Sequence, residues 1–119
     1  ATVLVSGSSG GWTMRIVLST IPAEAARSLA STLIEERLAA CVNVLPGVTS
    51  IYRWEERVET TEESLLVMKT AADRVSALST RVAELHPYDV PEIVVLEVCG
   101  VNATYAHWVN TETRSDTKC

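Results

Sequence analysis

The sequence predicts an α+β domain in which the elements follow in the order strand, helix, strand, strand, helix, strand. Apolar residues recur at three- and four-residue steps in two segments, which is typical of helices with one buried face. Short β-branched or alternating segments before, between and after them indicate the strands. The chain has 119 residues, which is enough for one domain with a single core. One fold must therefore account for all of these elements.

The first strand and the first helix meet at Pro22. Arg15 to Ile21 (RIVLSTI) is short, apolar and β-branched, as expected of a buried central strand. Pro22 suits the first turn of a helix, where its missing N–H costs nothing. One apolar stripe then continues to about Ala40, and it predicts a helix of about four turns through Ala26, Leu29, Leu33, Ile34 and Leu38.

A long hairpin is predicted next. Cys41 to Leu45 is extended, Pro46-Gly47 indicates a bulge or bend, and alternation resumes through Val48, Ser50, Tyr52 and Trp54. Glu55-Glu56-Arg57 should reverse the chain, because extended character returns at Val58 and runs on to Thr70. The far part, Glu59 to Ser64, is polar on both faces and is not expected to cover a core. Because long exposed edges invite pairing, we predict a protruding hairpin that pairs with a neighbouring subunit.

The remaining elements surround a rigid corner. Ala71 to Leu85 has the apolar stripe of a second helix, and His86 to Glu92 (HPYDVPE) follows directly. Its two prolines push the residues before them towards extended geometry, so the corner should be stiff. Glu92 to Val98 (EIVVLEV) is predicted as a last buried strand. After a turn at Gly100-Val101-Asn102, a short third helix is expected from Ala103 to about Thr111, with an apolar side of Tyr105, Trp108 and Val109.

Two successive β-α-β units with right-handed crossovers give a four-stranded antiparallel sheet with two helices on one face, the ferredoxin-like sandwich. We expect the domain to occupy residues 14–114. Residues 1–13 contain a Ser/Gly stretch and are interpreted as a flexible extension, with Met14 as a natural start. Residues 115–119 are interpreted as a polar tail.

Composition excludes several classes of partner. The net charge is −5 and no run of Lys or Arg occurs, which argues against nucleic-acid binding. No stretch approaches the roughly 18 apolar residues of a membrane helix, so no membrane association is expected. The three cysteines, Cys41, Cys99 and Cys119, form no C-x-x-C pair and favour a reducing cytoplasm over a disulfide framework. No basic segment typical of a signal peptide precedes the short apolar start.

Specific functions known for sandwiches of this shape lack their signatures here. No glycine-rich loop follows the first strand, as an acylphosphatase-like phosphate site would need. Leu65 to Met68 carries no aromatic residue on which RNA bases could stack. A soft-metal carrier would show a C-x-x-C pair, which is also missing. We therefore expect no catalytic residues and no organic cofactor.

Polar and aromatic residues of the hairpin and the corner form the candidate site. They are Tyr52, Trp54, Lys69, His86, Tyr88, Asp89 and Glu92. An imidazole with carboxylates suits a divalent metal ion, and histidine titrates near physiological pH. Structural alternatives stay open. The corner can be a simple helix-to-strand connector in which His86 caps a helix, Trp54 can pack at a subunit seam, and Cys41 can be a small buried apolar residue.

Several blocks in the same order resemble the CutA family of divalent-cation tolerance proteins, from about Arg15 to Arg114. The blocks are Ala39 to Asn43 with Pro46-Gly47, Ser50 to Glu55 (SIYRWE), Leu66 to Thr70 (LVMKT), His86 to Glu92 (HPYDVPE) and Tyr105 to Trp108 (YAHW). Because separate blocks match, the resemblance is far more specific than a single motif.

The resemblance implies a tight homotrimer in which the hairpin of one subunit extends the sheet of the next, an assembly similar to that of the PII-type nitrogen regulators. It also implies a role in tolerance of copper or another divalent metal, without an agreed enzymatic activity. The implied alternative is a PII-like scaffold that binds a small anion or a partner protein. Clefts between subunits would contain Tyr52, Trp54, Lys69, His86, Tyr88 and Glu92, with His86, Glu92 and Cys41 as the candidate metal ligands.

The chain departs from the family pattern at two positions. Ser19 stands where some members carry a cysteine near the end of the first strand, which weakens any cysteine-based copper site. Glu56 stands where many members place a glycine in the hairpin turn. If φ is positive there, Glu56 costs about 1 kcal/mol relative to glycine.

Overall fold

The computed structural model describes residues 4–6, as backbone, and residues 13–114. Residues 7–11 of the predicted Ser/Gly joint (residues 6–11) and the tail at residues 115–119, which includes Cys119, lie outside the described residues.

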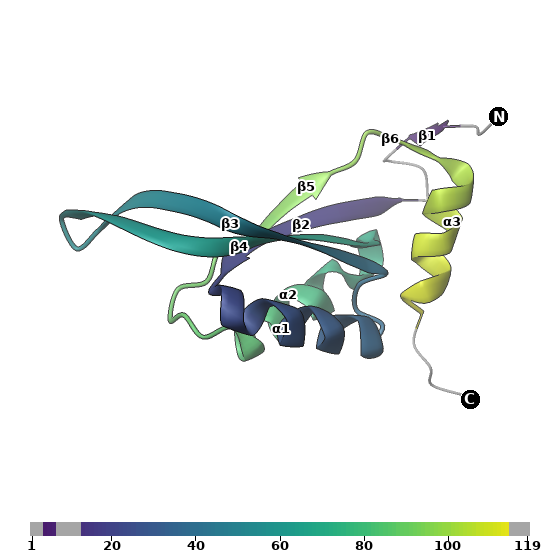
Figure 1. Cartoon of the computed structure of the whole chain (residues 1–119). Coiled ribbons are helices and arrows are strands. Elements are labelled where there is room, and N and C mark those ends of the chain that lie inside the picture. Colours follow the sequence, from purple (N-terminus) through teal and green to yellow (C-terminus); the bar gives the residue numbers. More distant parts are fainter. Residues whose placement is uncertain (1–3, 7–12, 115–119) are drawn as a thin grey trace.

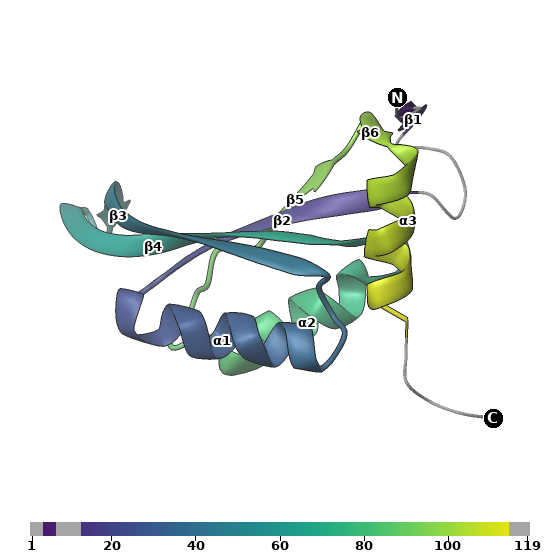
Figure 2. The same ribbon diagram turned by 45° about the vertical axis from the view of Figure 1, so that its right-hand side comes forward.

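A four-stranded antiparallel sheet forms the centre of the molecule (Figure 1). Its strands, in the order in which they pair, are β3 (Cys41–Trp54), β4 (Arg57–Ala71), β2 (Met14–Ile21) and β5 (Val94–Glu97). Helices α1 (Ala23–Glu35) and α2 (Val75–Leu85) lie side by side on one face of this sheet (Figures 1 and 2). This arrangement confirms the predicted ferredoxin-like fold.

Four further elements lie at the other end of the sheet from the hairpin. The predicted third helix is confirmed as α3 (Ala103–Glu112). Residues Gly100–Asn102, predicted as a turn, form a short strand, β6, that pairs with β1 (Leu4–Ser6). A 3-10 turn at Ala72–Arg74 precedes α2, so that helix begins four residues later than its apolar pattern indicates. No helix in the described part of the chain is long and apolar enough to cross a membrane.

The core lies between the sheet and the two helices. Leucine, isoleucine, valine, alanine and methionine fill it, as expected of a chain without phenylalanine, and the fully buried members include Val17, Ile21, Leu33, Leu66, Met68, Leu78 and Val82. Ser19 lies on the same face of β2 as Val17 and Ile21 and is also fully buried. Its hydroxyl has no hydrogen-bond partner among the described residues. A cysteine at this position would therefore face the core.

Helix α1 ends five residues before the predicted limit at Ala40. Arg37 has φ 59°, and its N–H donates to the carbonyl of Ile34 at 3.0 Å. The N–H of Leu38 donates to the carbonyl of Leu33 at 2.9 Å, which completes a Schellman motif. Leu38 and Leu33 are both buried, as this motif favours. The apolar stripe extends past the helix because Leu38 packs back onto the core.

The hairpin of β3 and β4 protrudes far beyond the rest of the sheet (Figure 1). Its register shifts between Leu45 and Val48, so the bulge predicted at Pro46-Gly47 is confirmed, and Gly47 has φ 75°. One expectation for the hairpin is wrong. Within the polar segment 59–64, Glu63 is only 5% exposed and Ser64 only 2%. The corner covers Glu63, which no local sequence pattern shows.

The last strand is shorter and more exposed than predicted. β5 has four residues instead of the expected seven, and Val94, Val95 and Leu96 are each more than 40% exposed. Their apolar composition suggested a buried strand, but β5 lies at the edge of the sheet and pairs only with β2. The monomer therefore leaves an apolar edge uncovered.

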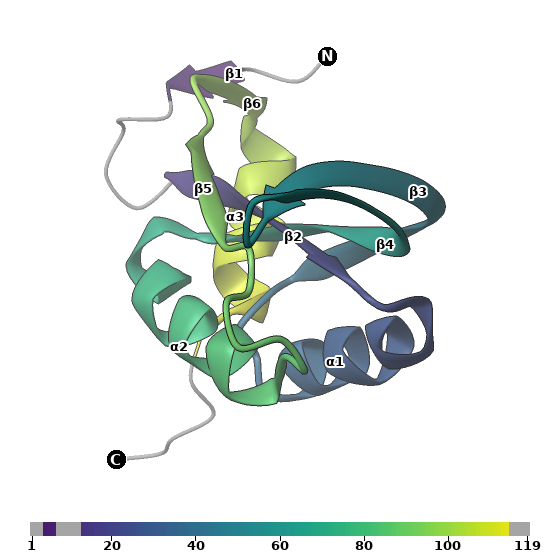
Figure 3. The same cartoon turned by 90° about the vertical axis from the view of Figure 1, so that its left-hand side faces the viewer.

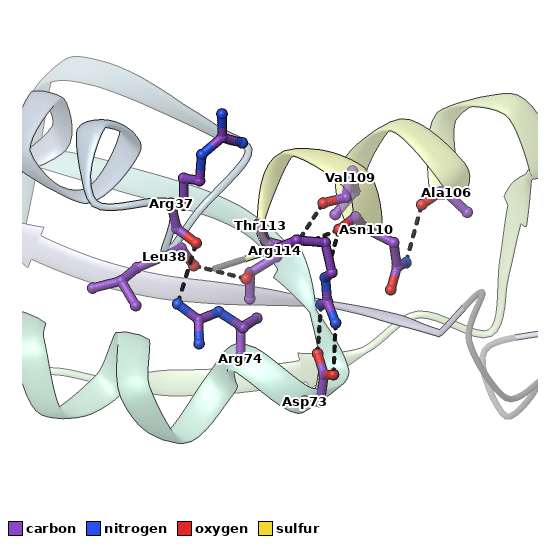
Figure 4. A network of polar contacts seen from close by, with 10 residues as sticks. Arg37, Leu38, Asp73, Arg74, Ala106, Val109, Asn110, Thr113 and Arg114 are labelled. Atoms are coloured by element: carbon purple, nitrogen blue, oxygen red, sulfur yellow. Dashed lines mark hydrogen bonds and ion pairs between the residues drawn. The ribbon is translucent and has the colours of Figure 1, made fainter. Parts of the chain in front are cut away.

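One ion pair and hydrogen bonds from arginines link α3 and the end of α1 to the 3-10 turn (Figure 4). Arg114, just past α3, binds both carboxylate oxygens of Asp73, at 2.7 and 2.9 Å. Arg74 donates to the carbonyl of Arg37 at 3.5 Å, and the Arg37 side chain donates to the carbonyl of Glu112 at 3.3 Å. Bidentate guanidinium–carboxylate pairs fix orientation, so α3 has a defined position against the domain.

The hairpin turn provides a test of backbone strain. Glu55 and Glu56 have φ 49° and 68°, the positive values that a two-residue type I′ turn requires. We predict that Glu56→Gly raises the free energy of unfolding by about 1 kcal/mol, because glycine has no Cβ penalty at positive φ. Urea denaturation measures the change.

Gly47 provides the matched reverse substitution. A Cβ there would meet nothing within 4 Å, so Gly47→Ala should destabilise by a similar amount through the backbone alone. An unchanged or reduced stability of Glu56→Gly, alongside a destabilised Gly47→Ala, would contradict the interpretation.

Candidate functional site

A groove of about 870 Å³ lies where the hairpin meets the corner. Figure 3 shows the hairpin end-on, with the corner segment between α2 and β5. The polar lining residues are Thr20, Ser50, Thr61, Glu63, Asp89 and Glu92. The apolar and aromatic ones are Ile51, Tyr52, Trp54, Pro87, Tyr88 and Val90. None of these described lining residues is Lys, Arg or His, so the groove carries only acidic charge.

His86 fastens the start of the corner to the sheet. It caps α2 through its backbone with φ −73° and ψ 137°, the extended geometry predicted for a residue before proline. Its Nδ1 accepts a hydrogen bond from the Tyr88 N–H at 3.1 Å, and its Nε2 lies 2.8 Å from the carbonyl oxygen of Thr20. Because Nδ1 accepts, Nε2 must carry the proton and donate to that carbonyl. Both ring nitrogens are thus occupied, and the buried side chain is not among the residues that line the groove.

Tyr88 fastens the middle of the corner to the hairpin. Its hydroxyl donates to Oε2 of Glu63 at 2.7 Å, and its ring stands 4.8 Å from the ring of His86. Burial and the hydrogen bond to Glu63 raise the pKa of Tyr88 to about 12. Tyr88 is therefore a neutral donor at physiological pH. This bond satisfies the buried Glu63 carboxylate, which would otherwise be costly to remove from water.

The remaining groove residues are more open to solvent. Oε1 of Glu92 accepts a hydrogen bond from the Thr20 hydroxyl at 3.3 Å. The Tyr52 hydroxyl lies 2.9 Å from that of Thr61 across the hairpin. Tyr52 is 43% exposed and Trp54 48%. These two rings offer accessible surface on the hairpin wall.

Two of the predicted site residues lie away from the groove. Lys69 on β4 pairs with Cys41 on β3. The groove residue Thr20 pairs with Leu65, which lies four residues before Lys69 on β4. The Lys69 ammonium donates to the Asn43 side-chain oxygen, and the Cys41 thiol lies 3.9 Å from the same atom. The predicted site residues that line the groove together are Tyr52, Trp54, Tyr88, Asp89 and Glu92. His86 is not among the lining residues but bonds to the Tyr88 N–H, and Lys69 and Cys41 lie apart from the groove.

The three candidate metal ligands do not converge within one chain. Among the described residues, no group of three or more His, Cys, Asp or Glu side chains could hold a metal ion. His86 and Glu92 share Thr20 as a hydrogen-bonding neighbour, but Cys41 lies on another part of the sheet. A complete metal site would need His86 to leave a hydrogen bond, or a ligand from a second subunit.

Glu63 is the site residue that sequence reasoning missed. A signal was present, because alternation along the hairpin places residues two apart on the same face. Ser50 pairs with Thr61 and Tyr52 with Glu59, so Glu63 belongs to the face that carries Tyr52. Its burial could not be inferred, since the Tyr88 hydroxyl comes from a segment 25 residues away in sequence.

Comparisons with known proteins agree on one family. The family model described as CutA1 divalent ion tolerance protein matches residues 15–112. The divalent-cation tolerance protein CutA of Thermus thermophilus is 50% identical over 99 residues, which cover 82% of this chain and 96% of that protein. The chloroplastic protein CutA 1 of Oryza sativa is 44% identical over 100 residues, 83% of this chain and 56% of that protein.

A solved structure extends the comparison to the fold. It is titled as the PII-like protein CutA from a Nostoc species in apo form and superimposes with a TM-score of 0.80 at 38% identity, covering 85% of this chain and 98% of that one. The rice relative is named for the chloroplast, so the cytoplasmic location expected for this chain stays a prediction.

The raised pKa of Tyr88 makes stability depend on alkaline pH. Because the folded pKa of about 12 exceeds the value near 10 of an unfolded tyrosine, the folded state holds this proton more tightly. Its contribution to stability is complete below about pH 10 and is lost as pH rises through about 12. Tyr88→Phe should therefore flatten the fall in unfolding free energy in a series of urea titrations across this range. The same alkaline fall in both proteins would contradict the assignment.

Proposed function

Because the chain belongs to the CutA1 divalent ion tolerance protein family, we propose that it is a divalent-cation tolerance or metal-responsive protein of the copper type. It acts as a homotrimer and binds a metal ion or a small ligand in clefts between subunits. The observation that carries this proposal is the groove, in which aromatic and acidic side chains meet without a single basic residue among the described lining. We propose a binding role rather than a catalytic one.

Unpaired edges of the sheet support the assembly. β3 and β5 are the outer strands, and the hairpin tip exposes Ile51 to 68% and Val58 to 65%. Exposed apolar residues on a long strand edge favour pairing with another chain. If the hairpin of one subunit extends the sheet of the next, the groove at its base becomes a cleft between subunits.

Charge supports a cationic ligand in this cleft. Glu63 and Glu92 face the groove, and Asp89 lies in the exposed part of the corner. Carboxylates attract divalent cations, and His86, which shares Thr20 with Glu92 as a hydrogen-bonding neighbour, offers an imidazole, a borderline ligand. A metal ion bound by His86 would displace the hydrogen bond to Thr20 or to the Tyr88 N–H.

One observation favours the alternative, a PII-like scaffold that binds a small anion or a partner protein. Lys69 forms no ion pair with a carboxylate among the described residues, and its ammonium interacts with the neutral side chain of Asn43. An anion would bind there rather than in the acidic groove. Bound buffer anions at Lys69 in crystals would support this role.

The assembly gives a direct prediction. Because the exposed edges need a partner, analytical ultracentrifugation at micromolar concentration should report about three times the chain mass of 12.9 kDa. A stable monomer would contradict the proposal, since the groove would then have no neighbouring subunit.

Metal binding is tested by calorimetric titration of Cu(II) and Zn(II). We predict that His86→Ala lowers Cu(II) affinity by about tenfold or more, as for loss of a metal-ordering histidine. His107→Ala is the matched control, because it removes the other described histidine, on α3 and outside the groove. If the wild type and both variants bind the metal ions equally weakly, the protein has no metal site at His86. Circular dichroism and the trimer mass verify that each variant is folded.

A further inference from the structure

The groove presents negative charge on both of its walls. Glu63 comes from the hairpin, and Asp89 and Glu92 come from the corner. Glu63 is buried, so its charge acts in a medium of lower dielectric than water, where electrostatic attraction is stronger. An anionic ligand would meet repulsion from both sides.

These carboxylates are spread out rather than gathered at a point. No three potential metal ligands converge in the described part of the chain. Glu63, on β4, is engaged by the Tyr88 hydroxyl of the corner, and Glu92, in the corner, is engaged by the Thr20 hydroxyl of β2. Three ligands from one described chain therefore do not surround a single small ion in the groove. A ligand with positive charges at several positions can approach more than one carboxylate.

Aromatic surface lines the same groove. The rings of Tyr52 and Trp54 are nearly half exposed, and Tyr88 lines the opposite wall. Aromatic faces attract organic ammonium groups and also pack against alkyl chains. The volume of about 870 Å³ lies in the range of sites for small organic molecules, far larger than a bare ion needs.

We propose that the groove binds a linear polyammonium ion, a di- or triamine whose ammonium groups meet the carboxylates and whose alkyl chain packs on the rings. This inference rests on the proposed function, because it names the small ligand of the same cleft. It makes Trp54 and Glu92 the residues that set ligand affinity, one through its ring and the other through its charge.

Calorimetric titration of the full-length protein with spermidine tests the proposal. We expect saturable binding with one spermidine per subunit. Trp54→Leu and Glu92→Gln should each lower the affinity about threefold or more, through loss of a cation–π contact or of an ion pair. Mg²⁺ added at the same concentration of positive charge should displace little spermidine, because it has no alkyl chain to pack on the rings. The dianion glutarate should not bind in the groove.

Matched variants separate the groove from general surface effects. Trp108→Leu removes a tryptophan of similar exposure, 42%, on α3. Glu62→Gln removes the carboxylate next to Glu63 that accepts a hydrogen bond from Thr49 outside the groove. Both controls should bind spermidine as the wild type does. If Trp54→Leu fails to assemble, the comparison of spermidine affinity between Glu92→Gln and its control Glu62→Gln tests the proposal.

Three results would overturn the proposal. They are the absence of saturable spermidine binding, an equal loss of spermidine affinity in a variant and its control, and full displacement of spermidine by Mg²⁺ at the same concentration of positive charge. The trimer mass and Cu(II) affinity are measured on the same preparations. Spermidine failure with trimer and Cu(II) binding intact overturns only this inference. A monomeric protein without Cu(II) binding overturns the proposed function itself.

Discussion

The hydrogen bond from Tyr88 to Glu63 is the contact on which the groove depends. It joins the proline corner to the base of the hairpin, two segments that share no sheet pairing with each other. Without it, Glu63 would be a buried carboxylate with no donor, at a cost of several kcal/mol. His86 adds a second fastening by donating to the Thr20 carbonyl while accepting from the corner's own backbone. Because Pro87 and Pro91 restrict the segment between, two contacts suffice to position it.

The β3–β4 hairpin has two structural roles. Beside the bulge at Gly47 it must hold Glu63, the partner of Val48, at a fixed position against the corner, and towards its tip it carries Tyr52 and Trp54. At its tip it exposes apolar residues and closes with two glutamates at positive φ. Strained turns and exposed apolar tips are costly in a monomer, and the proposed pairing between subunits would offset the second cost. This is the physical connection between the assembly and the groove that we propose.

Metal tolerance and organic-cation binding make related demands on the groove. Both require negative charge without nearby cations, which the lining provides. They differ in geometry, because a metal ion needs several ligands at one point and a polyammonium ion needs charges separated by apolar surface. The hydrogen bonds that already occupy His86 and Glu63 favour the second arrangement within one chain. Lys69 lies on the sheet away from the groove, where its ammonium donates to the Asn43 side chain.

The sequence by itself determined the order of the elements, the ferredoxin-like fold, the bulge at Pro46-Gly47 and the family to which the chain belongs, because periodicity, turn residues and motif blocks are local. It also placed Tyr52, Trp54, Tyr88, Asp89 and Glu92 in one candidate site. Only the tertiary structure decided that α1 ends at Glu35, that β5 is an exposed edge, that Glu63 is buried and that Lys69 and Cys41 lie elsewhere. Those features depend on contacts between residues distant in sequence. The Tyr88 hydroxyl of the corner, for example, is the donor that Glu63 of the hairpin meets in place of water.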